Sequence, residues 1–241
     1  MIKGTRMMMK QKVRSPNFTM RHIGDGGPGF IVSGIGEASL PLTITLWYRY
    51  AEYPTQTGIW SSRLVVKYGD SSTGCGFGTL NFPGTYAERA ELIEAKYWAY
   101  FSLLPTENYT DVSWHHLALV VKSGTYPWRN AVFVDGIPYQ TAEGGQSAGM
   151  SIPSGQFSLC GRNGDGWPAT VDVSRACVFQ GELTETEVVQ DMAMGSVPPA
   201  DGNLIHFWNG TTDSGVVKDI VGDWDLTQSV GCQILEESPW S

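Results

Sequence analysis

The sequence feature that most constrains the fold is a pair of β-prone runs joined by Asp135-Gly136. Ala131–Val134 precedes the dipeptide and Ile137–Thr141 follows it. Asp-Gly between two such runs favours a two-residue turn in which both central residues take positive φ. The two runs are therefore predicted to form an antiparallel hairpin.

Two segments upstream of this hairpin alternate with the period of a strand. Over Leu42–Tyr48, one side carries Leu and Ile and the other carries Thr and Trp, which predicts a half-buried strand. Over Trp114–Lys122, His116, Ala118 and Val120 share one side, and the other side is aliphatic. Because both sides of the second strand are largely apolar, we expect it to lie mid-sheet or between layers.

The remaining segments are also mostly β-prone, and only one convincing helix is predicted. Residues 86–97 have helical propensity, but strands on both sides favour a strand or an excursion loop there. Thr184 and Glu187 have the spacing of a capping box, so a helix is expected over residues 183–194, ending at Gly195. Further strands are predicted at residues 17–35 (two around the Gly24–Gly27 turn), 59–68, 74–82, 97–104, 156–160 paired with 169–179, 204–208 and 224–227.

Composition agrees with an all-β fold. Charged residues make up only 17% of the 241-residue chain and glycines number 29, which indicates short strands and many turns. We predict an antiparallel jelly-roll β-sandwich over residues 17–195, with the one short helix. Residues 1–16 are expected to be an N-terminal arm, and residues 196–241 a tail that packs on the same sandwich.

Charge argues against several classes of partner. The net charge is −8, which disfavours nucleic acid as a partner. No apolar run is long enough to span a membrane. The arm carries five basic residues (Lys3, Arg6, Lys10, Lys12 and Arg14), and no apolar stretch typical of a signal peptide follows them. We expect the protein to reach a virion or an extracellular surface without a signal peptide.

Three stretches together resemble the laminin-G and pentraxin-like branch of the concanavalin A-like lectin/glucanase superfamily. Leu42-Thr-Ile-Thr-Leu-Trp47 is similar to an early strand of that family. Trp114-His-His-Leu-Ala-Leu-Val120, followed by Val132-Phe-Val-Asp-Gly136, is similar to its central hairpin. Gly161-Arg162, the run to Phe179 and then Leu183–Glu187 are similar to its last strand and helix. The resemblance covers roughly residues 15–195 and implies the fold, whereas a fold alone does not imply an activity.

The chain lacks the catalytic motifs that this resemblance would require of an enzyme. Glycosidases of the superfamily place carboxylates as E-x-D-x-x-E on one strand, and no such pattern is present. Glu88, Glu91 and Glu94 indicate a solvated face instead. His115 and His116, adjacent on a strand, point to opposite faces and cannot chelate one metal, and His116 is expected to be a hydrogen-bonded core residue. We predict a non-catalytic protein.

Two loops carry the residue types that bind sugars. An aromatic ring packs on the C–H face of a pyranose, and planar polar groups bond to its hydroxyls. The first loop offers Tyr126 and Trp128. The second offers Arg162, Asn163, Asp165 and Trp167. These six residues form the predicted glycan site, and the alternative is that the rings fold back onto the sandwich.

Metal and disulfide chemistry are expected to play little part. No cofactor is predicted, although Asn163, Asp165 and Asp172 could supply hard oxygen ligands to Ca²⁺ beside a glycine-rich turn. Cys75, Cys160, Cys177 and Cys232 lack metal-ligand spacing, and we expect them to be free, buried thiols.

Two functions fit these observations. The first is a phage or virion structural, decoration or adhesion protein with a lectin-like fold. The second is a dedicated carbohydrate-binding module, with calcium as an optional ligand. The expected partners are a neighbouring structural protein or a glycan, within a homo-oligomer or a larger assembly.

Overall fold

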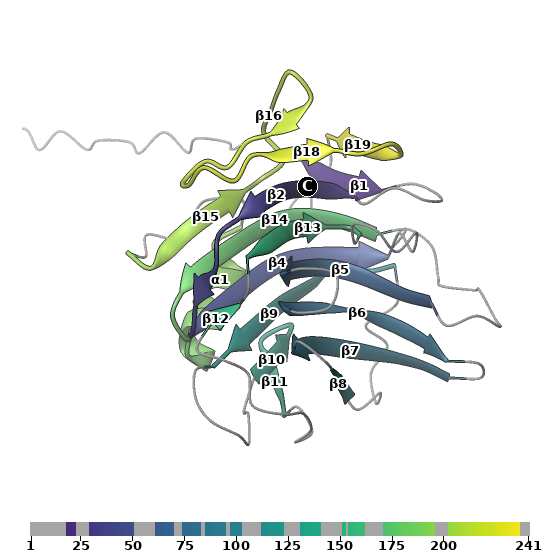
Figure 1. Ribbon diagram of the computed structural model, residues 1–241, viewed down its shortest axis with the longest axis vertical. Coiled ribbons are helices and arrows are strands. Elements are labelled where there is room, and N and C mark those ends of the chain that lie inside the picture. Colours follow the sequence, from purple (N-terminus) through teal and green to yellow (C-terminus); the bar gives the residue numbers. More distant parts are fainter. Residues whose placement is uncertain are drawn as a thin grey trace, which may run out of the picture.

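The computed structural model of the chain is a β-sandwich with one described helix (Figure 1). Two large antiparallel sheets, A and B, face each other, and a two-stranded ribbon joins them at one side. The structure describes residues 18–22, 29–50, 61–69, 74–82, 85–94, 97–102, 112–122, 131–140, 151–152, 154–161, 171–195 and 202–236. The predicted all-β antiparallel sandwich is confirmed.

In the described part of the chain, sheet A has eight strands, seven of them in one continuous path. The eighth, β15, pairs with β14 beside that path. In spatial order the strands are β11 (Ile137–Gln140), β10 (Ala131–Val134), β9 (His115–Val121), β4 (Leu42–Tyr50), β14 (Val171–Gln180), β1 (Thr19–His22) and β19 (Cys232–Leu235), with β15 at Leu204–Trp208.

Sheet B has nine strands among the residues that the structure describes. In spatial order they are β16 (Thr212–Asp213), β17 (Val216–Val217), β18 (Leu226–Gln228), β2 (Phe30–Ile35), β13 (Gly155–Leu159), β5 (Ser61–Gly69), β6 (Gly74–Phe82), β7 (Thr85–Glu94) and β8 (Tyr97–Ser102). The small ribbon pairs β3 (Ala38–Ser39) with β12 (Ser151–Ile152).

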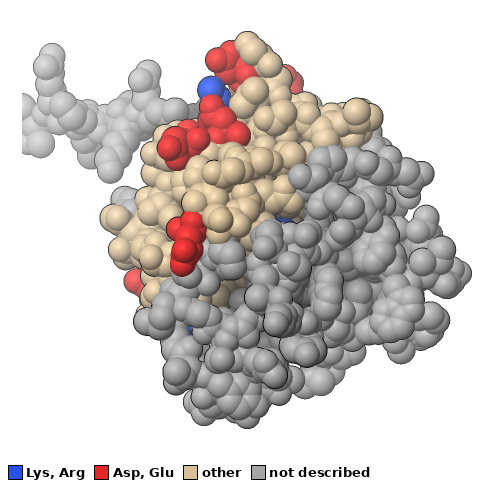
Figure 2. Space-filling view, in the orientation of Figure 1, with Lys and Arg blue, Asp and Glu red and all other residues tan. Residues whose placement is uncertain are grey.

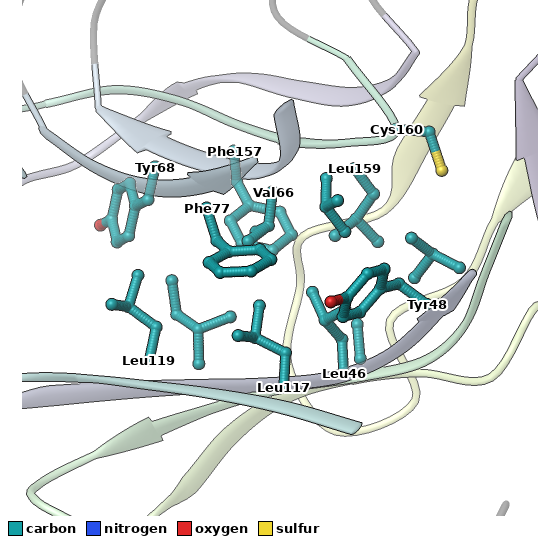
Figure 3. Close-up of a cluster of buried hydrophobic side chains, with 14 of the residues drawn as sticks. Leu46, Tyr48, Val66, Tyr68, Phe77, Leu117, Leu119, Phe157, Leu159 and Cys160 are labelled. Atoms are coloured by element: carbon teal, nitrogen blue, oxygen red, sulfur yellow. The ribbon is translucent and has the colours of Figure 1, made fainter. Parts of the chain in front are cut away.

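The main core lies between the two sheets (Figure 3). Leu46 and Tyr48 of β4 and Leu117 of β9 face aromatic and aliphatic side chains of sheet B, including Phe77 and Phe157. The predicted alternation of β4 and β9 is confirmed, because one set of alternate residues from each strand enters this core and the other set does not. Buried aromatic and branched side chains of this size contribute about 1.5–3 kcal/mol each to folding.

Sheet A also has a packed outer face, because the helix lies on it. Helix α1 (Glu185–Ala193) begins with the predicted capping box, in which Thr184 Oγ1 accepts from the Glu187 amide and the Glu187 carboxylate accepts from the Thr184 amide. Val188 of α1 and the preceding Leu183 pack on alternate residues of the sheet, among them Ala118, Val120 and Phe179. The helix therefore covers a face of sheet A rather than an edge of the sandwich.

The Asp135-Gly136 turn forms as predicted. Asp135 has φ 53° and Gly136 has φ 77°, and β10 pairs with β11 from Val134 and Ile137 outward. The predicted pairing of residues 156–160 with 169–179 is wrong. β13 lies in sheet B between β2 and β5, whereas β14 lies in sheet A, so the chain between them crosses from one sheet to the other.

Residues 86–97, which had helical propensity, and the tail after residue 202 both form strands. Residues 86–97 contribute to β7 and to the start of β8. β7 pairs with β6 and with β8, and a helix in its place would leave the facing edges of those strands without backbone partners. The tail supplies β15 and β19 to sheet A and β16–β18 to sheet B. No helix in the described part of the chain has the length and apolar character needed to cross a membrane.

Candidate functional site

The outer face of sheet A carries a row of polar and aromatic side chains beyond the helix. Arg49 of β4 lies directly opposite Asp172 of β14, and Asp172 lies directly opposite Arg21 of β1. Trp114 immediately precedes β9, and the Arg49 guanidinium carbon lies 4.7 Å from the centre of its ring. We call these four residues, Trp114, Arg49, Asp172 and Arg21, the outer-face row.

Asp172 ties this row together. Its carboxylate accepts from Arg21 Nε at 2.6 Å, from Arg21 Nη2 at 2.6 Å and from Arg49 Nε at 2.7 Å. The Asp172 side chain is fully buried, while the side chains of Arg21 and Arg49 remain 26% and 22% exposed. A buried carboxylate thus holds two partly exposed guanidinium groups in fixed positions, which is a strong charge-assisted arrangement.

A β-bulge in β14 decides which side chains reach this face. The register of β14 against β4 shifts between Val173 and Ala176. Val173 and Ala176 both enter the core between the sheets, so the extra residue lets Asp172 and Arg175 face outward together. The second neighbour of β14 also changes here, from β1 before the bulge to β15 after it.

Arg175 belongs to a second ion network, which helix α1 covers. Arg175 Nη1 donates to Asp191 Oδ2 at 3.0 Å and to the Asp191 carbonyl at 3.1 Å, and Nη2 pairs with Oδ1. His116 Nε2 lies 3.2 Å from Asp191 Oδ2. Arg175 and His116 are fully buried and Asp191 is 3% exposed. The expectation that His116 is a hydrogen-bonded core residue is confirmed.

The pKa directions agree with a structural role for this covered network. Burial lowers the pKa of His116, and this effect outweighs the opposing influence of Asp191. Burial by itself would raise the pKa of Asp191, but the hydrogen bond from His116 and the hydrogen bonds and positive charge of Arg175 lower it well below its usual range. At neutral pH the network is thus an ionised Arg–Asp pair with a neutral histidine.

The tail contains a third network, which orders its own loop. Asp219 accepts from His206 Nδ1 at 2.5 Å and from the backbone amides of Phe207, Val221, Gly222 and Trp224. The His206 ring stacks on Trp224 with ring centres 3.7 Å apart. Both oxygens of Asp219 are occupied by these donors, so the carboxylate serves to fix the loop.

The six residues of the predicted glycan site lie outside the described residues: Tyr126, Trp128, Arg162, Asn163, Asp165 and Trp167. The described strands that flank the two loops nevertheless separate them. Val121 and Ala131, which flank the first loop, lie at the end of sheet A that holds Leu42. Val171, which follows the second loop, pairs with Tyr50 at the opposite end, next to the outer-face row.

Asp172, the described member of the expected calcium set, has other partners. Its two oxygens accept from Arg21 and Arg49, and two positive charges at this distance oppose the approach of a further cation. Among the described residues, no three His, Cys, Asp or Glu side chains gather as metal ligands would.

The four cysteines are free thiols. Cys75, Cys160 and Cys177 are buried as expected, whereas Cys232 is partly exposed. Burial raises the pKa of Cys75 and of Cys177 to about 12. Both thiols therefore stay protonated at neutral pH and behave as small apolar core residues.

Sequence reasoning missed Arg21, Arg49 and Trp114 as site residues. The alternation of β4 carried a usable signal. Leu46 and Tyr48 point into the core, so Arg49, between Tyr48 and Tyr50, is expected on the opposite, outer face of the strand. The register that places Arg21 opposite Asp172 had no local signal, since the two residues are far apart in the chain.

The fold and motifs match a family model that is described as the concanavalin A-like lectin/glucanases superfamily, of the laminin-G type, over residues 32–189. That match covers well over half of the chain. The chain belongs to this superfamily. The resemblance inferred from the three sequence stretches is thereby confirmed.

Two solved structures show the same fold. One is a protein from Bacteroides ovatus ATCC 8483, provisionally described as carbohydrate-binding, with a TM-score of 0.58 and 13% identity over 91% of this chain and 59% of that chain. The chain therefore spans about three fifths of that protein's length. The other is the native heptameric SAP-like pentraxin from Limulus polyphemus, with a TM-score of 0.55 and 16% identity over 90% of this chain and 98% of that chain. A comparison with curated protein sequences gives no match.

Proposed function

We propose that this superfamily member is a non-catalytic, lectin-like binding module whose ligand is a carbohydrate. The observation that carries the proposal is the outer-face row on the part of sheet A beyond the helix. Trp114 offers an apolar ring, and Arg49 and Arg21, which Asp172 holds in place, offer planar groups that bond to hydroxyls. This is the combination that sugar sites use.

The row is also preorganised. Asp172 fixes both arginines, so a ligand would not have to pay much of the entropy of ordering two long side chains. The partial exposure of Arg21 and Arg49 leaves their outer surfaces in reach of solvent and of a ligand.

The loop of Arg162, Asn163, Asp165 and Trp167 is the natural extension of this site. It ends at Val171, one residue before Asp172. The strands that flank Tyr126 and Trp128 end at the other end of the sheet, so those two residues belong to a separate surface in this proposal.

A non-catalytic role fits the described carboxylates. A general acid needs a raised pKa, whereas the pKa values of Asp191 and Asp219 are both lowered. Burial opposes this lowering at both residues, and hydrogen bonds from neighbouring donors outweigh it.

The test is a glycan array probed with the purified full chain, followed by calorimetry on the strongest saccharide. Trp114→Ala and Trp167→Ala should each weaken binding about tenfold or more, because each removes a stacking ring worth more than 1 kcal/mol. Trp128→Ala is the matched control and should bind as the unaltered chain does.

The outcomes separate the alternatives. Binding lost in Trp128→Ala but retained in Trp114→Ala would move the site to the other end of the sheet. Absence of binding to every glycan would overturn the carbohydrate proposal. The array is run with calcium and with a chelator, and binding that requires calcium would support a calcium site on Asn163 and Asp165 without Asp172, which Arg21 and Arg49 already occupy.

The second candidate is a structural, decoration or adhesion role on a virion or another extracellular surface. Exposed apolar side chains favour it: Ile137 of β11 is 47% exposed and Val189 of α1 is 42% exposed, and Gly136 lies against Val189. Such patches are typical of protein contacts. Light scattering after size-exclusion chromatography tests this role, because a monomer at all concentrations would contradict self-assembly through this patch.

A further inference from the structure

The tip of the tail combines exposed apolar and acidic side chains. Ile220 and Val221 are 47% and 45% exposed. Around them lie acidic residues of the same short segment, Asp213, Asp223 and Asp225, with Lys218 as the one basic residue between positions 211 and 236. Figure 2 shows acidic side chains gathered at the top of the view, where Figure 1 places β16 and β18. We call these six residues the tail tip.

The single cation of the tail tip does not neutralise it. Lys218 pairs with Asp225 at 2.5 Å. Asp213 and Asp223 are exposed, and the only hydrogen bond described for the Asp213 carboxylate is from the neighbouring Ser214 hydroxyl. The tail tip therefore carries a net negative charge together with two exposed apolar side chains.

The N-terminal arm has the complementary composition. Residues 1–16 contain five basic side chains and no acidic one, together with four methionines, Met1, Met7, Met8 and Met9. The net charge of −8 is thus divided into +5 in the arm and −13 in the rest of the chain. Methionine side chains adapt well to irregular apolar surfaces.

The first described residue after the arm, Phe18, lies against Gly210, which is three residues before Asp213 of the tail tip. Phe18 is fixed there, because Ser174 Oγ donates to its carbonyl at 3.1 Å. Gly210, two residues before β16, approaches Phe18 so closely that a Cβ on Gly210 would lie 2.5 Å from the Phe18 Cβ. A segment of sixteen residues can extend about 50 Å at most, so the arm can reach the tail tip of its own molecule.

We propose that the tail tip is the docking surface for the N-terminal arm, residues 1–16, of the same molecule. The methionines pack on Ile220 and Val221, and the lysines and arginines lie against Asp213 and Asp223. Each exposed ion pair contributes about 0–1 kcal/mol, so the docking depends on several pairs, on apolar contact and on the high effective concentration of a tethered segment. This interaction is independent of sugar binding.

The test is zero-length carbodiimide cross-linking of the full chain, which joins lysine amines to carboxylates in direct contact. A mixture of unlabelled and ¹⁵N-labelled protein distinguishes links within one molecule from links between two. We expect mass spectrometry to find Lys3, Lys10 or Lys12 joined to Asp213 or Asp223 within one molecule, with a yield that falls as salt is raised.

Matched variants complete the experiment. Asp213→Asn with Asp223→Asn should abolish these links, whereas Glu37→Gln with Glu185→Gln, which alters two exposed acids elsewhere, should leave them unchanged. Circular dichroism verifies that both double variants are folded. Links spread evenly over Glu37, Glu185 and the tail tip, or no links at all, would overturn the proposal. Links that join labelled to unlabelled chains would show that the arm binds a second copy instead.

Discussion

The two ion networks on the outer face of sheet A differ in what covers them. Both are anchored on β14, Asp172 before its bulge and Arg175 after it. Arg175 and His116 are buried beneath helix α1, which supplies Asp191 to them. Arg21 and Arg49 instead keep about a quarter of their side-chain surface exposed. The same chemistry of guanidinium and carboxylate is thus placed once inside the protein and once at its surface.

This difference teaches what each network can do. The covered network fastens the helix to the sheet through Asp191, but it is out of reach of any ligand. A partly exposed network contributes less to stability because water competes with it, and the same exposure makes it available for binding. Four predictions follow from this contrast.

Removal of the central carboxylate of the covered network should have the largest effect. Asp191→Ala leaves Arg175 buried with an uncompensated charge, and we expect the free energy of unfolding to fall by about 3–5 kcal/mol. Urea denaturation followed by tryptophan fluorescence measures the change. A loss below about 1 kcal/mol would mean that water reaches Arg175 and that the two networks are alike.

Removal of the central carboxylate of the outer-face row should cost less stability and more function. Asp172→Ala releases two arginines that can turn to solvent, so we expect a loss of about 1–3 kcal/mol. Saccharide binding should fall together with it, because both guanidinium groups lose their fixed positions. In Asp172→Asn, which keeps the shape and one acceptor oxygen, binding should be partly retained. Unchanged binding in Asp172→Ala would remove the row from the site.

Acid should weaken the covered network through His116. Since burial lowers the pKa of His116 below the ordinary value of 6.5, the unfolded chain takes up a proton that the folded protein does not. The contribution of neutral His116 to the free energy of unfolding is fully present above pH 6.5. It declines as the pH falls below 6.5, by at most about 1.4 kcal/mol per pH unit for one proton. Urea denaturation at pH 7.5, 6.0 and 5.0 should show a shallower decline for His116→Gln than for the unaltered chain, and equal slopes would contradict the assignment.

Loss of the helix cap should have the smallest effect. Thr184→Ala removes the acceptor for the Glu187 amide and should cost about 1 kcal/mol. Because Asp191 still fastens the helix, hydrogen exchange should accelerate only in the first turn of α1. If exchange instead accelerates along the whole helix, the cap rather than the covered network holds the helix in place.

Local pattern was sufficient to predict most of the fold. The Asp135-Gly136 turn, the alternation of β4 and β9 and the Thr184 capping box are each decided by residues close together in the chain. The partners of β13 and β14 were predicted incorrectly, because sequence proximity favoured a hairpin where the chain crosses between sheets. Which strands meet depends on how both sheets close, and no short segment contains that information.

The candidate site was less predictable for a related reason. Arg21, Arg49 and Asp172 come from three strands, and only the register across β1, β14 and β4 aligns them. The bulge adds a second difficulty, since strict alternation from Asp172 would turn Arg175 into the core. An aromatic residue beside polar ones, such as Trp167, can be singled out from sequence alone. A row built from several strands can be recognised only once the register of the sheet is known.

The pairing of β1 with β19 has a consequence for synthesis. Thr19 lies opposite Leu235, and β18 pairs with β2, so strands from the first part of the chain find these neighbours only among its last residues. A ribosome must deliver the chain as far as β18 and β19 before the two sheets can be completed. Strands such as β4 and β9 can pair earlier, but the edges of β1 and β2 that later receive β19 and β18 must be kept from wrong partners until those strands emerge.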